Sequence, residues 1–256
     1  MGNALLRAAP IFPQLIVTGA IASAASLALG RDAGQVAGIG QANLLITSDL
    51  PAALAEADVA LDFSNGGATR SNLQACRAAR KPLLLGTTGF GAELDPELEA
   101  TAREVALLVA PNTSLGAALL AALTREAARA LPADFDVDVL ELHHRLKQDA
   151  PSGTALALAH TLAAARGLPL PRSSTSAAVA SGPRDAGIGL ASLRAGDIVG
   201  EHTVLFCGAG EDLVLTHRAR DRGVFARGAL SAALWLSSRP PGRYGMQDFI
   251  CAKTDA

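Results

Sequence analysis

With 256 residues, the chain is long enough for one large domain or for two small ones with cores of their own. Half of the residues are hydrophobic, 18% are charged and the net charge is −2, so nothing favours a nucleic-acid or membrane-surface partner, since either selects for a basic face. The three cysteines, Cys76, Cys207 and Cys251, are widely spaced, which indicates neither a disulfide framework nor a metal site and is typical of the reducing cytoplasm.

The first half of the chain alternates short apolar runs with alanine-rich stretches of helical composition. We expect strands over residues 15–17, 44–47, 59–63, 83–85 and 106–109. Helices are expected over residues 69–79 and 96–104. Uniformly apolar strands separated by helices predict an α/β fold with a parallel sheet covered on both faces. Ligands bind at the carboxyl ends of such strands, and three of these runs end in small, polar or glycine-rich turns.

The second half predicts a different architecture. Helices are expected over residues 115–130, 155–166 and 226–236, and strands over residues 136–139, 190–193, 202–207 and 212–218. Strands that cluster, rather than alternate with helices, suggest an α+β substrate domain. Residues 172–189 are rich in serine, glycine and proline and are predicted to form a mobile loop.

The densest polar cluster in the chain spans residues 141–149. Two histidines, an arginine and a lysine fall within five residues: His143, His144, Arg145 and Lys147. Such a cluster attracts anions, and histidine and lysine can both donate protons near neutral pH. Ser152-Gly153-Thr154 follows directly before a predicted helix, whose first backbone N–H groups would bind a carboxylate or phosphate. The pattern predicts a pocket for a small acidic substrate, with a solvated strand end and an ordinary helix cap as the alternative.

Several blocks of the sequence resemble the dihydrodipicolinate reductase family, the nicotinamide-dependent reductases of bacterial lysine biosynthesis. The first is ELHHRLKQDAPSGTA over residues 141–155, which is similar to the family's signature at every fixed position. The others are RAGDIVGEHT over 194–203, DFS over 62–64 with GTTGF over 86–90, APNTSLG over 110–116, and the C-terminal stretch 225–236. The resemblance covers essentially the whole chain.

The resemblance implies a Rossmann-like dinucleotide-binding domain over residues 1–113 and 224–256. Residues 114–223 would form an α+β domain for substrate binding and tetramerisation. It further implies reduction of a small cyclic dicarboxylate by NADH or NADPH, which yields tetrahydrodipicolinate in the diaminopimelate route to lysine. The expected partners are this substrate and further copies of the chain in a cytoplasmic homotetramer.

Site residues follow from the same resemblance. His143 would be the principal acid/base group and Lys147 the second proton donor. Three residues would hold the substrate carboxylates: His144, Gly153 and Thr154. Two strand-end turns would line the cofactor: Gly86, Thr87 and Thr88 in one, and Ala110, Pro111, Asn112 and Thr113 in the other. Glu201 and His202 are expected to have structural roles, because hydrogen-bonded structural polar groups outnumber catalytic ones outside pockets.

The chain departs from the family's pattern in two places. The family begins with a strand and a Gly-x-x-Gly-Arg-Met-Gly loop, and Met1-Gly2 aligns with the last two residues of that loop. Two interpretations stay open: an active reductase in which Met1 is an internal methionine of a longer reading frame, or a truncated, catalytically impaired homologue that acts as a subunit or binding protein. Ala22 and Ser23 replace the residues that discriminate NAD from NADP, so neither cofactor is preferred.

Overall fold

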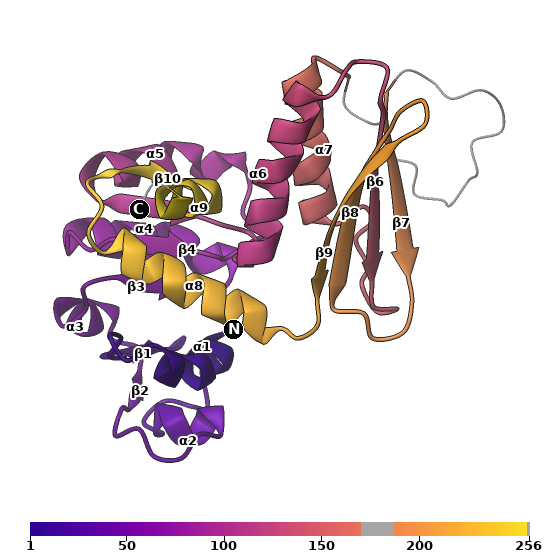
Figure 1. Cartoon of the computed structure of the whole chain (residues 1–256). Coiled ribbons are helices and arrows are strands. Elements are labelled where there is room, and N and C mark those ends of the chain that lie inside the picture. The colour runs from indigo at the N-terminus through magenta and orange to yellow at the C-terminus, as the bar shows by residue number, and fades with distance from the viewer. Residues whose placement is uncertain (170–186, 255–256) are drawn as a thin grey trace. The chain divides into compact units, whose positions relative to one another are not determined.

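The computed structural model describes residues 1–169 and 187–254, which form two compact units (Figure 1). One unit comprises Met1–Leu115 together with Gly223–Ala256, and the other comprises Gly116–Arg222. Within the described ranges, no helix is long and apolar enough to cross a membrane. Most of the predicted mobile loop, residues 172–186, lies outside the described residues.

The first unit is built on parallel strands. Four of them form one sheet in the order β10-β5-β4-β3, with bounds Gly242–Tyr244, Ala106–Val109, Leu83–Leu85 and Ala60–Asp62. A separate two-stranded parallel sheet joins β1 (Ala20–Ile21) to β2 (Ile46–Thr47). The side chains of β4 are completely buried, as expected for an apolar strand covered on both faces.

Helices cover the strands of the first unit. They are α1 (Gly2–Ala8), α2 (Ala33–Ala37), α3 (Leu50–Ala55), α4 (Gly66–Ala78), α5 (Asp95–Glu104), α8 (Gly223–Leu236) and α9 (Met246–Thr254), with short 3₁₀ turns η1 (Ala9–Ile11) and η2 (Ala92–Leu94). Ala226 and Leu230 of α8 are buried against Ala8 and Ala9 near the N-terminus. The C-terminal segment therefore contributes to the core of the N-terminal unit.

Several features of this unit differ from the sequence prediction. The strand predicted over residues 15–17 is wrong, because β1 begins at Ala20 and Ile16 is 84% exposed. Among the described residues β1 pairs only with β2, over two positions, so no ladder extends to Ile16. Strand β10 was not predicted, since Gly242-Arg243-Tyr244 carries no apolar run. Helix α4 begins at Gly66, earlier than predicted, because Asn65 caps it by accepting a hydrogen bond from the Ala68 N–H at 3.2 Å.

The second unit is a mixed sheet with two helices. Its strands follow the order β7-β6-β8-β9, with bounds Ile188–Arg194, Asp136–His143, Gly200–Cys207 and Asp212–Ala219. Helices α6 (Leu115–Ala130) and α7 (Gly153–Arg166) pack on one face, where Leu158 and Leu162 of α7 share a core with Val139 and Phe206. Figure 1 shows both helices beside the strands. Strand β6 continues four residues beyond the predicted end, which places Glu141 and His143 inside the strand.

Candidate active site

The last residues of β6 position the first of the predicted site residues. Side chains alternate along this strand, so Glu141 and His143 lie on the same face as the core residue Val139. Both are buried, and Glu141 has no exposed surface at all. A carboxylate and a histidine on the buried face of a strand require hydrogen-bond partners, because an unpaired buried charge is strongly unfavourable.

Glu141 has a complete set of such partners. Its Oε1 accepts hydrogen bonds from Nη2 of Arg194 at 2.8 Å and from the Ser152 N–H at 3.1 Å, and its Oε2 accepts from Nη1 of Arg194 at 3.0 Å. The Nδ1 atom of His143 also contacts Oε2. Burial alone would raise the pKa of Glu141, but the hydrogen bonds from His143 and Arg194 outweigh it and lower the pKa to about 2. Glu141 is therefore ionised.

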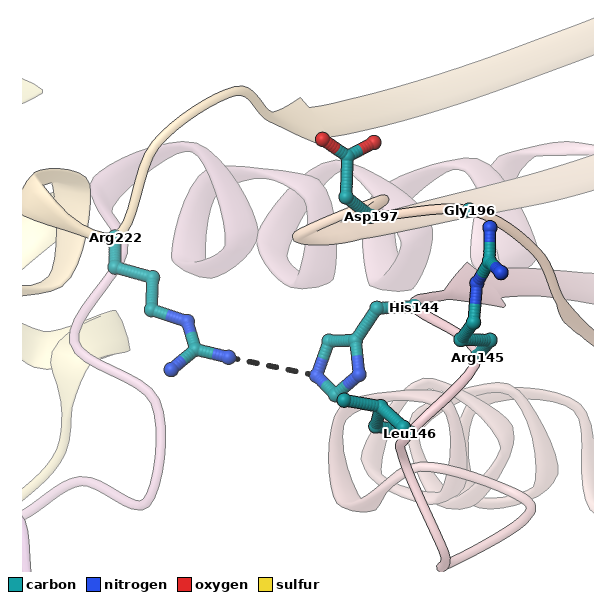
Figure 2. A pocket seen from close by; sticks show the side chains of 6 residues that line it. All are labelled: His144, Arg145, Leu146, Gly196, Asp197 and Arg222. Carbon is teal, nitrogen blue, oxygen red and sulfur yellow. Dashed lines mark hydrogen bonds between the residues drawn. The ribbon is translucent and has the colours of Figure 1, made fainter.

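His144, the next residue along the chain, lines a pocket of the second unit. This pocket has a volume of about 610 Å³ and is lined by His144, Arg145, Leu146, Gly196, Asp197 and Arg222. Figure 2 shows the His144 ring directed at Arg222, whose Nη2 lies 3.5 Å from Nε2 of His144. Because a guanidinium can only donate, Nε2 acts as the acceptor in this contact. The pocket thus carries two arginines, a histidine and one carboxylate, Asp197, so its charged groups are more positive than negative.

The turn after β6 places Lys147 next to this pocket. The Lys147 N–H donates to the carbonyl oxygen of His144 at 3.0 Å, which closes the turn. Its Nζ lies 2.8 Å from both carboxylate oxygens of Asp149, and the Lys147 side chain is 22% exposed. An incoming substrate carboxylate would have to compete with Asp149 for this ammonium group.

Helix α7 begins at the predicted anion-binding tripeptide. Ser152 is its N-cap and accepts a hydrogen bond from the Ala155 N–H at 3.2 Å. Gly153 is exposed and Thr154 is partly exposed in the first turn. The positive end of the helix dipole lies here, which favours a bound carboxylate. Because the Ser152 N–H also donates to Glu141, the structure ties this helix start directly to the carboxylate that contacts His143.

His202 supports the same helix start from the neighbouring strand. Its Nε2 lies 3.1 Å from Oγ of Ser152, and its ring packs edge-on against His143 with centroids 5.2 Å apart. Burial, helped by the nearby charge of His143, lowers the pKa of His202 to about 4. We expected a structural role for His202, and its contact with Ser152 agrees with that role. The sequence block 194–203 did not reveal the contact, because Ser152 and His202 are 50 residues apart.

This histidine should make the protein sensitive to mild acid. In the unfolded chain His202 takes up a proton near pH 6.5, whereas the folded chain resists protonation until about pH 4. Between these values the unfolded state binds more protons, so the free energy of unfolding falls as pH falls, by about 3 kcal/mol in total. Urea titrations at several pH values should show this loss in the wild type and a smaller loss in His202→Gln. An identical pH dependence in both proteins would contradict the assignment.

The predicted cofactor residues lie in the first unit, at the carboxyl ends of adjacent strands. Gly86, Thr87 and Thr88 follow β4, and residues 110–113 follow β5. The parallel register pairs Leu85 with Val109, and the Ala110 N–H donates to the Leu85 carbonyl at 2.9 Å, so the two turns begin side by side. A Cβ atom at position 86 would lie 2.1 Å from the Phe63 ring, so a side chain here would have to displace this ring.

Two of the threonines in these turns use their hydroxyl groups internally. Thr87 Oγ1 donates to Oδ1 of Asp62 at 2.9 Å, and Thr113 Oγ1 donates to the Phe225 carbonyl of α8 at 2.7 Å. Both residues are buried, whereas Thr88 and Pro111 are exposed. The turns are therefore held in place by Thr87 and Thr113, and a ligand at this edge would meet backbone groups and the exposed neighbours of these two residues.

The chain matches models of a known protein family along nearly its whole length. The family model for the N-terminus of dihydrodipicolinate reductase matches residues 1–113, and the model for its C-terminus matches residues 116–250. The first match contains both turns that were predicted to line the cofactor, and the second contains Glu141, His143, Lys147 and the start of α7.

Individual relatives give the same result. The 4-hydroxy-tetrahydrodipicolinate reductase of Alkalilimnicola ehrlichii is 46% identical over 98% of this chain and 94% of its own length. The enzyme of the same name from Anaeromyxobacter dehalogenans is 43% identical over 98% of this chain and 93% of its own length. Among solved structures, dipicolinate-bound dihydrodipicolinate reductase from Paenisporosarcina sp. TG-14 covers 96% of this chain and 94% of its own, with a TM-score of 0.77 and 23% identity, which shows a shared fold.

Proposed function

This chain belongs to the dihydrodipicolinate reductase family, and from that premise we propose that it is a 4-hydroxy-tetrahydrodipicolinate reductase. The reaction would use NADH or NADPH and yield tetrahydrodipicolinate in the diaminopimelate route of lysine biosynthesis. The observation that carries the proposal is the linked set of groups in the second unit. His143 is bonded to Glu141, Glu141 accepts the N–H of Ser152, and Ser152 begins a helix whose dipole favours an anion.

The second unit would bind the substrate dianion and supply its protons. His144, Gly153 and Thr154 would hold the carboxylates, since a histidine N–H and a helix N-terminus both suit a negative group. His143 would act as the principal acid/base group and Lys147 as the second proton donor. Arg222 and Arg145 add positive charge around the pocket that His144 lines, which stabilises negative charge as it develops on the substrate.

The first unit would hold the dinucleotide. The residues fit such a ligand, because the turns 86–88 and 110–113 begin side by side at the carboxyl edge of a parallel sheet and the glycine at position 86 packs directly against the Phe63 ring. Thr88, Ala110, Pro111 and Asn112 would line the site, while Thr87 and Thr113 would fix the two turns through Asp62 and Phe225. A bound reduced nicotinamide would supply the hydride.

Both nicotinamide cofactors remain candidates for this chain. Ala22 follows β1, at the position where dinucleotide-binding folds carry the carboxylate that binds the ribose. Its N–H donates to the Thr47 carbonyl at 3.0 Å, which fixes the backbone there. Alanine has no group that binds the ribose hydroxyls, and Ser23 supplies a hydroxyl without charge. Neither the acidic residue that selects NAD nor the arginine that selects NADP is present at these two positions.

A catalytically impaired homologue that acts as a subunit or binding protein is the second candidate function. The intact His143, Lys147 and Ser152-Gly153-Thr154 favour the active enzyme, because a binding protein would have no need for a buried histidine bonded to an ionised carboxylate. The relatives that carry the reductase name match this chain over 98% of its length. We therefore keep the active reductase as the conclusion.

We also propose that the enzyme is a cytoplasmic homotetramer that assembles through the sheet of the second unit. On the face of this sheet opposite the core, Leu140 is 37% exposed, Leu193 is 48% exposed and Val214 is 52% exposed. The strand register places all three on one face. Apolar side chains gathered on one face of a sheet are typical of subunit interfaces, because burial there removes them from water.

Genetic complementation tests the proposed reaction. A bacterial strain that lacks its own reductase and needs added diaminopimelate should grow without the supplement when it expresses this chain. The His143→Ala variant, expressed to the same level, should fail to restore growth, because it lacks the acid/base group. Failure of the wild type, when the folded protein is present in the cells, would favour the impaired homologue.

A further inference from the structure

The sequence block 194–203 was given no role in the proposed reaction, yet three of its residues lie next to residues of the block 141–155. Arg194 bonds to Glu141, His202 lies against Ser152, and a side chain at Gly200 would lie 3.1 Å from Nε2 of His143. Strand pairing explains these contacts, because β6 lies between β7 and β8. The register pairs His143 with Arg194 and Glu141 with His202. The second block therefore surrounds the end of β6.

The contact between Glu141 and His143 fixes which ring nitrogen carries a hydrogen. Glu141 is ionised and can only accept hydrogen bonds, so Nδ1 of His143 must donate to it. The proton that His143 gains and loses is then the one on Nε2. This nitrogen lies beside Gly200, where a Cβ atom would come within 3.1 Å of it, so the absence of a side chain at position 200 leaves room next to Nε2.

Arg194 fixes Glu141 in turn. Its two terminal nitrogens bind the two carboxylate oxygens in a fork, and its Nη2 also donates to the Asp149 carbonyl at 2.6 Å. A forked arginine–carboxylate pair restricts the orientation of both groups more than a single contact does. The same arginine thereby connects β7, β6 and the turn that carries Lys147.

We propose that Glu141, held by Arg194, is the positioning residue of His143: it orients the imidazole ring, keeps the hydrogen on Nδ1 and stabilises the imidazolium that donates from Nε2. In the step itself the Nε2–H bond breaks and a C–H bond forms at the substrate carbon that has gained negative charge. His143 becomes neutral, Glu141 remains a carboxylate, and Nε2 takes its next proton from water. The inference rests on the proposed function only in assigning proton transfer to His143.

A double-mutant cycle measures whether Glu141 acts through His143. Glu141→Gln keeps the size of the side chain but removes its charge, and it should lower kcat by a factor on the order of 10², as for loss of an acid/base group, with KM within about threefold. In a His143→Ala background the same change should have little further effect, since the group it positions is gone. Equal losses in both backgrounds, or a normal kcat in Glu141→Gln, would overturn the inference.

A matched control separates this effect from the general loss of a paired carboxylate. Glu97 in α5 also bonds to an arginine, Arg77, at 3.0 Å and is largely buried, but it lies in the first unit. Glu97→Gln should leave kcat unchanged. If it lowers kcat as much as Glu141→Gln does, the loss at Glu141 reflects ion-pair removal in general and the inference fails.

Nuclear magnetic resonance gives a readout that does not depend on activity. In wild-type protein with ¹⁵N-labelled histidine, Nδ1 of His143 should carry a hydrogen at neutral pH, with the resonance assigned by its loss in His143→Ala. In Glu141→Gln we expect the amide oxygen to accept the hydrogen bond from Arg194, which turns the amide NH₂ toward Nδ1 of His143. Because the NH₂ group donates, Nδ1 must then accept, and the ring hydrogen should move to Nε2. A wild-type Nδ1 without hydrogen overturns the inference, whereas an inactive wild type with the expected spectrum overturns the proposed function alone.

Discussion

Replacement of His143 or Lys147 by alanine should lower the turnover number by a factor on the order of 10² or more in each case, as expected when a positioned acid/base group is removed. His143 is bonded to a buried, ionised carboxylate, and Lys147 lies in the turn that follows the same strand. Both groups belong to the second unit, whereas the two turns proposed to hold the cofactor belong to the first. The affinity for NADH or NADPH should therefore change little.

Steady-state kinetics and cofactor titration on the same preparations measure this prediction. His160→Ala and Lys81→Ala are matched controls, because His160 is exposed on α7 and Lys81 lies in the first unit, where its Nζ donates to the Ala55 carbonyl at 3.5 Å. The controls should retain normal turnover. Near-normal turnover in both His143→Ala and Lys147→Ala would show that the assigned roles are wrong.

Arg194→Met should destabilise the second unit by about 3–5 kcal/mol, because it leaves the charge of Glu141 buried without its cation. Glu141 has no exposed surface and the Arg194 side chain is only 19% exposed, so water cannot replace the lost partner. The free energy of unfolding from urea titrations measures the change. Fluorescence or hydrogen exchange within Gly116–Arg222 would assign it to this unit.

The double variant Arg194→Met with Glu141→Leu gives the matching control. Removal of both charges takes away the unpaired carboxylate, so this variant should recover much of the stability that the single variant loses. Its turnover should nevertheless stay low, because His143 then has no carboxylate partner. A single variant as stable as the wild type would contradict the burial and pairing of Glu141.

Much of the sheet in the first unit could be predicted from the sequence, and the strands that were missed or wrongly predicted have physical explanations. Strands β4 and β5 have the predicted bounds, because each is a short apolar run with a turn at its end. Strand β10 was not predicted, because a short edge strand that pairs with β5 needs no apolar pattern in its sequence. The run at residues 15–17 is as apolar as the others, but a strand also requires a neighbour to pair with, and apolar character alone does not show whether one is present.

The sequence predicted which residues form the candidate site, but it did not predict which of them are in contact. The cluster of His143, Lys147 and Ser152 was evident because its members are close in sequence. The pair of Glu141 with Arg194 spans 53 residues and depends on the register of β6 against β7, which no local pattern encodes. One signal could have found Glu141: the alternation that begins with Val137 and Val139 continues with Glu141 and His143, which places a carboxylate on the face of the strand that begins with apolar residues.

The measurement that tests the account most directly is the oxidation of NADH and of NADPH by the purified chain in the presence of 4-hydroxy-tetrahydrodipicolinate. The account predicts oxidation of at least one cofactor that depends on this substrate, is inhibited by dipicolinate and falls by a factor on the order of 10² in His143→Ala. Absence of substrate-dependent oxidation in a folded preparation that binds both dipicolinate and the cofactor, or full activity in His143→Ala, would contradict it.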